Sequence, residues 1–102
     1  MKKIITALAL SVAMISPAMA DRAEFCKAAT YMAEAIMNNR QSGVSVIDMM
    51  EIANNSQSNK KLLTSLITEA YAEPLYQTDE YKQKAATEFA AQQYLMCLKA
   101  GD

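Results

Sequence analysis

The spacing of apolar residues along the chain predicts helices rather than strands. From residue 21 onward, apolar positions recur three or four apart, and no stretch alternates apolar and polar residues as a half-buried strand does. Strong helix formers dominate this part of the chain, which holds one proline, Pro74, and two glycines, Gly43 and Gly101. We therefore predict an all-α protein: one compact, single-domain bundle of four helices, the second of them short.

The first predicted helix spans Asp21 to Asn39. The apolar residues expected to face the core are Phe25, Ala28, Ala29, Met32, Ala35 and Ile36, flanked by Cys26, Ala33 and Met37. A short second helix follows the turn at Gly43, with Ser45 as its N-cap and Asp48 three residues on, and it ends at Asn54-Asn55. Its apolar residues are Val46, Ile47, Met49, Met50 and Ala53.

The third predicted helix begins after Ser58 or Asn59. It ends near Ala72, because Pro74 disfavours helical geometry at the residue before it. The fourth helix begins after the N-cap Thr78, and Gly101 is its expected C′ residue. The core stripes of the two helices are Leu62, Leu63, Leu66, Ile67 and Ala70 in the third, and Ala85, Ala86, Phe89, Ala90 and Cys97 in the fourth, with Met96 beside the second stripe and Gln93 at its edge.

The first twenty residues have the three parts of a secretory signal peptide. Lys2 and Lys3 precede an apolar run of about twelve residues, and Ala18 and Ala20 then suit a signal peptidase. The run is too short to cross a bilayer comfortably, which takes roughly 20 residues. We therefore expect residues 1–20 to be a cleaved signal peptide and residues 21–102 to be a periplasmic helical domain; the alternative is an N-terminal anchor that is never cut.

The charge of the expected mature chain narrows its partners. Residues 21–102 hold 8 basic and 11 acidic residues, a net charge of −3. This balance argues against nucleic acid, which needs a basic patch, and against an anionic membrane surface. No later stretch is long and apolar enough to span a membrane, so we expect no span after signal cleavage.

Two cysteines, Cys26 and Cys97, lie near the two ends of the expected mature chain. An oxidising compartment converts paired thiols to disulfides, and two cysteines allow one pairing within the chain. We predict a disulfide that joins the first helix to the last; bonds to another chain are the alternative. A zinc site is disfavoured because the chain has no histidine to complete the four ligands.

Few residues remain for chemistry. The absence of histidine removes the usual general base and the commonest metal ligand. Glu69 and Glu73, four apart, could form an acid/base pair or bind a cation, although a solvated helix face explains them as well. Five methionines follow residue 20, without the clustering typical of a copper site. We expect no catalysis, no cofactor and no metal.

Two stretches are candidates for binding a partner. The first joins Arg40 and Gln41 to Ser45 through a glycine turn, and the second groups Tyr71, Tyr76 and Tyr81 around a proline. Each has a structural alternative. The arginine would hydrogen-bond the last carbonyls of its own helix, and the tyrosines would cover the rim of a small core.

Four short motifs of the chain resemble those of other small exported proteins. A cysteine near the mature start (Cys26), an Arg-x-x-Gly turn (residues 40–43), an aromatic-x-x-Pro step (residues 71–74) and a final cysteine (Cys97) resemble a loose group of small, mostly uncharacterised exported proteins of Gram-negative bacteria and their prophages. The resemblance implies no settled activity and no functional residue.

The function expected from these features is protein–protein binding in the periplasm. The protein would act on another envelope protein as an inhibitor, accessory subunit or envelope-stress factor, or would pair with a second copy as a homodimer. The alternatives are an acid-stress periplasmic chaperone, whose switch would rest on carboxylates that titrate near pH 4, and a prophage-encoded envelope or exclusion factor.

Overall fold

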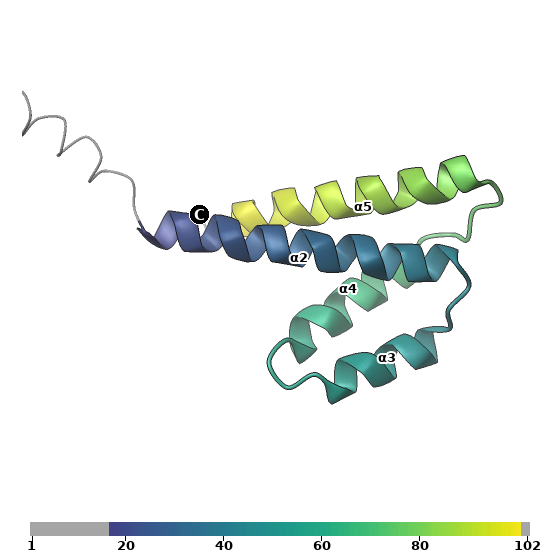
Figure 1. Cartoon of the computed structure of the whole chain (residues 1–102), viewed down its shortest axis with the longest axis horizontal. Coiled ribbons are helices and arrows are strands. Elements are labelled where there is room, and N and C mark those ends of the chain that lie inside the picture. The colour runs from purple at the N-terminus through teal and green to yellow at the C-terminus, as the bar shows by residue number, and fades with distance from the viewer. Residues whose placement is uncertain (1–16, 101–102) are drawn as a thin grey trace, which may run out of the picture.

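Four helices make up the part of the chain that the structure describes. The computed structural model describes residues 17–100 (Figure 1), with α2 over Pro17–Gln41, α3 over Val46–Asn55, α4 over Lys60–Ala72 and α5 over Asp79–Ala100. No strand occurs among these residues. The predicted all-α bundle with a short second helix is therefore confirmed. Residues 1–16 of the predicted signal peptide and the predicted C′ residue Gly101 lie outside the described residues.

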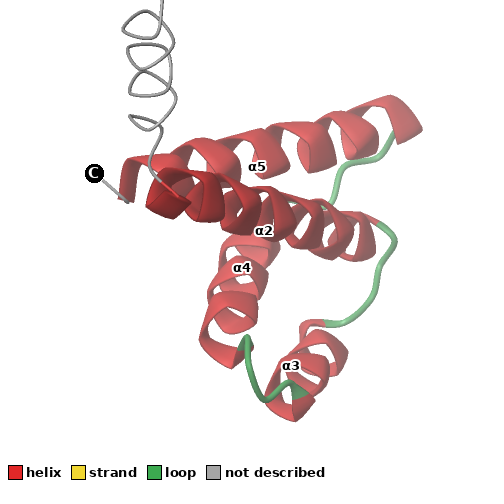
Figure 2. Cartoon of the chain, turned by 60° about the vertical axis from the view of Figure 1, so that its left-hand side comes forward, coloured by secondary structure: helices red, strands yellow, loops and turns green. Residues whose placement is uncertain are grey.

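The helices form two antiparallel pairs. Helices α2 and α5 lie side by side, α4 packs behind α2, and α3 packs on α4 (Figures 1 and 2). One face of the α2–α5 pair is thus covered by α4, while α3 lies farthest from the pair. Among the described residues, none of the helices combines the length and apolarity that crossing a bilayer requires.

A disulfide fixes the α2–α5 pair near the start of α2 and the end of α5. Cys26 and Cys97 are bonded, with their Cα atoms 5.6 Å apart, as predicted. Cys26 is completely buried and Cys97 is half-buried. Beyond the disulfide, the contact is lined by small buried side chains, which let the two helix axes approach closely. These side chains are Ala29 and Ala33 of α2, and Ala85, Ala86 and Ala90 of α5.

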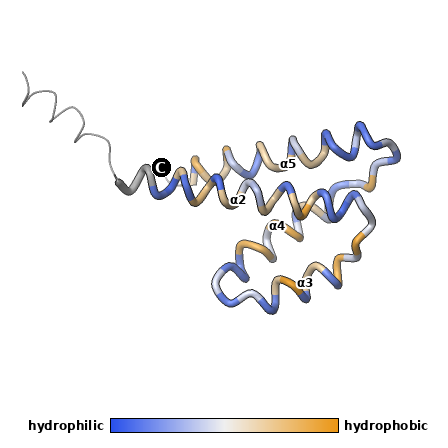
Figure 3. Tube along the Cα trace, in the orientation of Figure 1, coloured by the Kyte–Doolittle hydropathy of each residue, from blue (hydrophilic) through white to orange (hydrophobic). Residues whose placement is uncertain are grey.

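The core continues from this contact into α3 and α4. Its larger buried side chains are Ile36, Met37, Met49, Leu66, Ile67 and Phe89. The hydropathy of the chain follows this arrangement only in part. Apolar and polar positions are mixed along every helix (Figure 3), and several large apolar side chains are exposed. The predicted core stripe of α4 is confirmed for Leu66, Ile67 and Ala70.

The predicted core face of α2 was right for Ala29 and Ile36, which are buried, but the buried side as a whole lies part of a turn further around the helix. Phe25, Ala28 and Ala35 are exposed, whereas the residues expected to flank the stripe, Cys26, Ala33 and Met37, are buried. The disulfide explains the difference, because the side chain of Cys26 must point at α5 and a neighbouring residue lies about 100° around the helix. Met96 precedes the other cysteine and is likewise 53 % exposed.

The predicted helix ends follow local chemistry. Ser45 caps α3, because its hydroxyl accepts the backbone N–H of Asp48 at 3.1 Å. Thr78 caps α5 in the same way through the N–H of Tyr81, at 3.2 Å. Helix α4 stops at Ala72, and the next residue, Glu73, adopts the extended conformation that a following proline favours.

The turn between α2 and α3 depends on glycine. Gly43 has a φ of +91°, a conformation that residues with a Cβ atom rarely adopt. Its N–H donates to the carbonyl of Arg40 at 3.1 Å, and the N–H of Val44 donates to that of Asn39 at 3.0 Å. These bonds satisfy carbonyls that the end of α2 leaves free and turn the chain toward α3.

The disulfide should supply a large share of the stability. Replacing both cysteines (Cys26→Ala with Cys97→Ala) should lower the free energy of unfolding by about 4 kcal/mol, because the bond closes a loop of 71 residues in the unfolded chain. Urea denaturation followed by circular dichroism measures this. The wild-type chain in reductant should match the variant, and equal urea midpoints for the variant and the oxidised wild type would contradict the expectation.

Candidate functional site

The candidate binding residues meet at one end of the molecule. We call this the loop end: the α2–α3 turn and the first turn of α3 (residues 40–47) together with the α4–α5 connection and its flanks (residues 71–81), at the end of the α2–α5 pair away from the C-terminus in Figure 1. The six residues predicted to bind a partner are all found here: Arg40, Gln41, Ser45, Tyr71, Tyr76 and Tyr81. The two stretches are far apart in sequence, with a separation of 27 residues from Val44 to Tyr71, so only the fold joins them.

Gln41 is the residue that ties the two loops together. Its side chain is 3 % exposed, and its amide Nε2 donates to the carbonyl of Pro74 at 2.8 Å. The amide oxygen accepts the backbone N–H of Tyr76 at 2.9 Å. A single buried amide therefore hydrogen-bonds two backbone groups of the α4–α5 connection, the carbonyl of Pro74 and the N–H of Tyr76. This side chain fixes the loop end from inside rather than presenting itself to a partner.

Two cations strengthen the same end by capping helices. Arg40 donates from Nε and Nη2 to the carbonyl of Glu73, at 3.2 and 3.1 Å, and its guanidinium lies 5.2 Å from the ring centre of Tyr71. The alternative in which Arg40 bonds the last carbonyls of its own helix is therefore wrong. The carbonyl that Arg40 bonds belongs to Glu73, just after the end of α4. Lys82 correspondingly donates to the carbonyl of Gln41, the last residue of α2, at 2.8 Å. Both positions suit the negative end of a helix dipole.

Tyr71 fastens α4 to the α2–α3 turn. Its hydroxyl donates to the carbonyl of Val44 at 2.6 Å. Burial raises the pKa of the Tyr71 phenol; the positive charge of Arg40 opposes this rise, and the negative charge of Asp48 adds to it. Tyr71 is half-buried, so its role in the structure is mainly to hold the turn.

The remaining candidates lie closer to solvent. Ser45 is exposed, with its hydroxyl engaged as the N-cap of α3. Tyr76 is half-buried, and its ring centre lies 6.2 Å from that of Tyr81, which is 55 % exposed. Of the six candidates, Tyr81 therefore offers the largest free aromatic surface to a partner.

Sequence analysis missed three apolar residues of the loop end. Val46 and Ile47 were placed among the apolar residues of their helix, and Leu75 was not considered, yet they are 41 %, 70 % and 42 % exposed. Helix α3 has ten residues and packs on α4, so it buries only Met49 and Ala53. The adjacent pair Val46-Ile47 was the available signal, because neighbouring positions cannot both face one partner helix.

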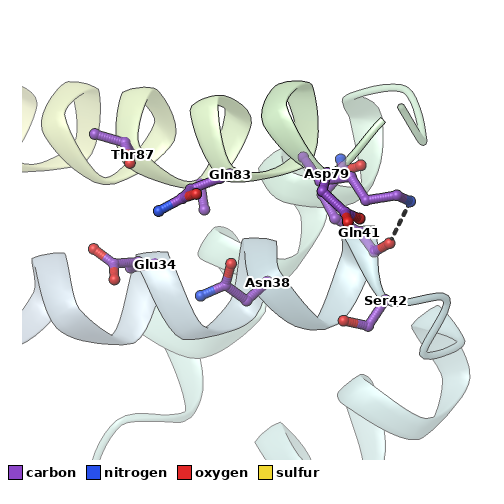
Figure 4. A pocket seen from close by; sticks show the side chains of 9 residues that line it. Glu34, Asn38, Gln41, Ser42, Asp79, Gln83 and Thr87 are labelled. Carbon is purple, nitrogen blue, oxygen red and sulfur yellow. Dashed lines mark hydrogen bonds between the residues drawn. The ribbon is translucent and has the colours of Figure 1, made fainter. Parts of the chain in front are cut away.

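A polar groove lies beside the loop end, between α2 and α5 (Figure 4). Its volume is about 330 Å³, and Glu34 and Asn38 of α2 face Gln83 and Thr87 of α5 across it. The bond from Lys82 to the carbonyl of Gln41 closes one end, as the dashed line in Figure 4 shows. Hydrogen-bonding side chains predominate in its lining, with Ala86 as the apolar residue, so it is a surface for polar contact rather than an enclosed ligand pocket.

Several of the residues considered for chemistry are engaged within the fold. Glu69 accepts a hydrogen bond from Nε2 of Gln93 at 2.7 Å, and Glu73 lies beyond the end of α4, so the two carboxylates do not share one helix face. Met37 and Met49 are buried in the core. Within residues 17–100 we find no group of three or more acidic, cysteine or histidine side chains placed to hold a metal ion.

Comparisons with known proteins add no assignment. No protein-family model, no curated protein and no solved structure matches the chain. The resemblance to small exported two-cysteine proteins therefore stays a prediction, and function has to be argued from the loop end itself.

Loss of the Gln41 amide should weaken the whole fold. Gln41→Leu should lower the free energy of unfolding by about 3 kcal/mol, because the carbonyl of Pro74 and the N–H of Tyr76 lose their partner. Urea denaturation measures the change. Gln83→Leu is the matched control: this glutamine is exposed, and its replacement should stay within about 0.5 kcal/mol. Equal urea midpoints for the two variants would remove Gln41 from the role assigned to it.

The raised pKa of Tyr71 predicts a dependence of stability on alkaline pH. The folded chain holds the phenol proton more tightly than the unfolded chain, so this contribution is present below about pH 10 and is lost as pH rises through the folded pKa. Tyr71→Phe should therefore destabilise the protein less at pH 11 than at pH 8, as measured by urea denaturation. A cost that is the same at both pH values would show that ionisation of Tyr71 is not coupled to folding.

Proposed function

We propose that this chain is an exported protein that acts by binding another protein of the cell envelope through its loop end, without catalysis. The observation that carries the proposal is a contrast within the loop end. Its backbone is tied by buried and half-buried side chains, while several of its apolar side chains remain in contact with solvent.

The fixed backbone favours binding because little order has to be gained. Gln41, Arg40 and Tyr71 each bond a backbone group more than 25 residues away, so both loops are held before a partner arrives. Association normally costs free energy when loops and side chains become ordered, and a preorganised surface avoids much of that cost.

The exposed side chains provide the contact. Ile47 and Tyr81 are 70 % and 55 % exposed, and Val46 and Leu75 extend the apolar surface. Aromatic and aliphatic residues on a rigid support are typical centres of protein–protein interfaces, where a few side chains carry most of the affinity. In this proposal, Arg40 and Gln41 act as positioning residues and the exposed apolar side chains make the contact.

Two features support the exported location. The first twenty residues carry the pattern of a cleaved signal peptide, with Lys2 and Lys3 before the apolar run. The Cys26–Cys97 disulfide suits the oxidising periplasm, whereas such bonds are rare in the cytosol.

A matched pair of variants on α3 tests the contact surface. Tagged wild-type chain, Ile47→Asp and Ile52→Asp are used to capture proteins from envelope extracts, with quantitative mass spectrometry as the readout. Ile47 is at the loop end, whereas Ile52 lies more than one turn further along α3 and is similarly exposed, at 59 %. Ile47→Asp should reduce capture of the partner about tenfold or more, because a charge is placed in an apolar contact, while Ile52→Asp should capture it as wild type does.

The proposal fails if Ile47→Asp, and its combination with Tyr81→Ala, capture every protein that the wild-type chain captures. Circular dichroism and urea denaturation of both variants confirm that a loss of capture does not reflect a loss of folding.

A further inference from the structure

A second surface of the molecule is left open by the way the helices pack. The α2–α5 pair has two faces, and α4 covers only one of them. The other face looks toward the viewer in Figure 1, and in the described part of the chain no helix packs on it. We call it the outer face and define it by Lys27, Tyr31, Glu34 and Asn38 of α2 and Gln83 and Thr87 of α5.

The α2 row of this face follows from helix geometry. Figure 4 shows Glu34 and Asn38 on the outer face, in front of α4. Tyr31 precedes Glu34 by three residues and Lys27 precedes Tyr31 by four, so all four residues lie on the same side of the helix. Tyr31 is 67 % exposed, and Lys27 and Glu34 are exposed as well. A large aromatic side chain thus lies in solvent between two opposite charges.

The charges of this row are complementary to those of the same row in a second copy that runs in the opposite direction. Lys27 lies about 6 Å from Tyr31 along the helix axis in one direction, and Glu34 lies about 4.5 Å from it in the other. Within one chain the two charges are seven residues apart, too far to pair as helix neighbours. If a second α2 lies antiparallel across the first with Tyr31 at the centre, Lys27 of each copy meets Glu34 of the other.

The half of the outer face nearer the loop end also holds the polar groove of about 330 Å³, lined in part by Glu34, Asn38, Gln83 and Thr87. In the antiparallel arrangement, the groove of each copy faces the half of the other copy's outer face that is nearer the disulfide.

We propose that two copies of this chain pair through the outer face, with α2 antiparallel to α2 and α5 antiparallel to α5. The two α2–α5 pairs then stack face to face as two layers of two helices, which is the packing of a four-helix bundle. The contact is symmetric and closed, because the same patch serves both copies. It adjoins the loop end, because Gln41, Ser42 and Asp79 also line the groove, and the two loop ends emerge at opposite ends of the dimer.

Charge reversal provides the test, with the purified, disulfide-bonded chain measured by sedimentation velocity across micromolar to millimolar concentration. We expect the wild-type mass to double as concentration rises. Lys27→Glu alone and Glu34→Lys alone should each raise the dimer Kd at least tenfold, because like charges then meet at both symmetric contacts. A mixture of these two variants should dimerise again, since every contact then pairs opposite charges, and the double variant Lys27→Glu/Glu34→Lys should recover as well.

The same measurement separates this inference from the proposed function. Ile47→Asp should leave the dimer intact, because Ile47 belongs to the loop end. A wild-type chain that stays monomeric throughout overturns the inference, and so does a dimer that ignores both single reversals. Both single variants change exposed helix positions, and their circular dichroism should match that of wild type.

Discussion

The covalent bond between Cys26 and Cys97 is the constraint on which the arrangement of helices depends. It joins α2 to the far end of α5, so the two long helices must run antiparallel. It also sets the rotation of α2, because the bonded side chain has to face α5. Small alanines along the same line then allow close packing, and α4 covers one face of the pair. The outer face stays open as a direct result.

The opposite end of the same pair is held by hydrogen bonds instead of sulfur. The buried amide of Gln41 bridges the carbonyl of Pro74 and the N–H of Tyr76. Arg40 and Lys82 each donate to a carbonyl at the end of a helix that is not their own. The α2–α5 pair is therefore fixed at both ends, once by a covalent bond and once by a network of hydrogen bonds.

These fixed ends support the proposal that the chain acts by binding. The polar side chains in its interior and loops are used to hold backbone groups, and the sulfurs are bonded to each other. What remains free is apolar or charged surface on rigid supports: the loop end and the outer face. The two surfaces adjoin at the polar groove. In the proposed dimer the two loop ends lie at opposite ends, which would let one dimer hold two partner molecules.

The sequence alone determined which segments are helical and where most of the helices begin and end. Ser45, Thr78 and Pro74 mark helix ends through bonds and sterics that act within a few residues, and two cysteines permit one pairing within the chain. The tertiary structure decided which side of each helix is buried. Phe25 and Ile47 are as apolar as Ile36, and their exposure follows from the rotation that the disulfide imposes on α2 and from the single partner of α3. It also gave Gln41 its role, because the groups that this amide bonds lie more than 30 residues away and local patterns carry no record of contacts at that distance.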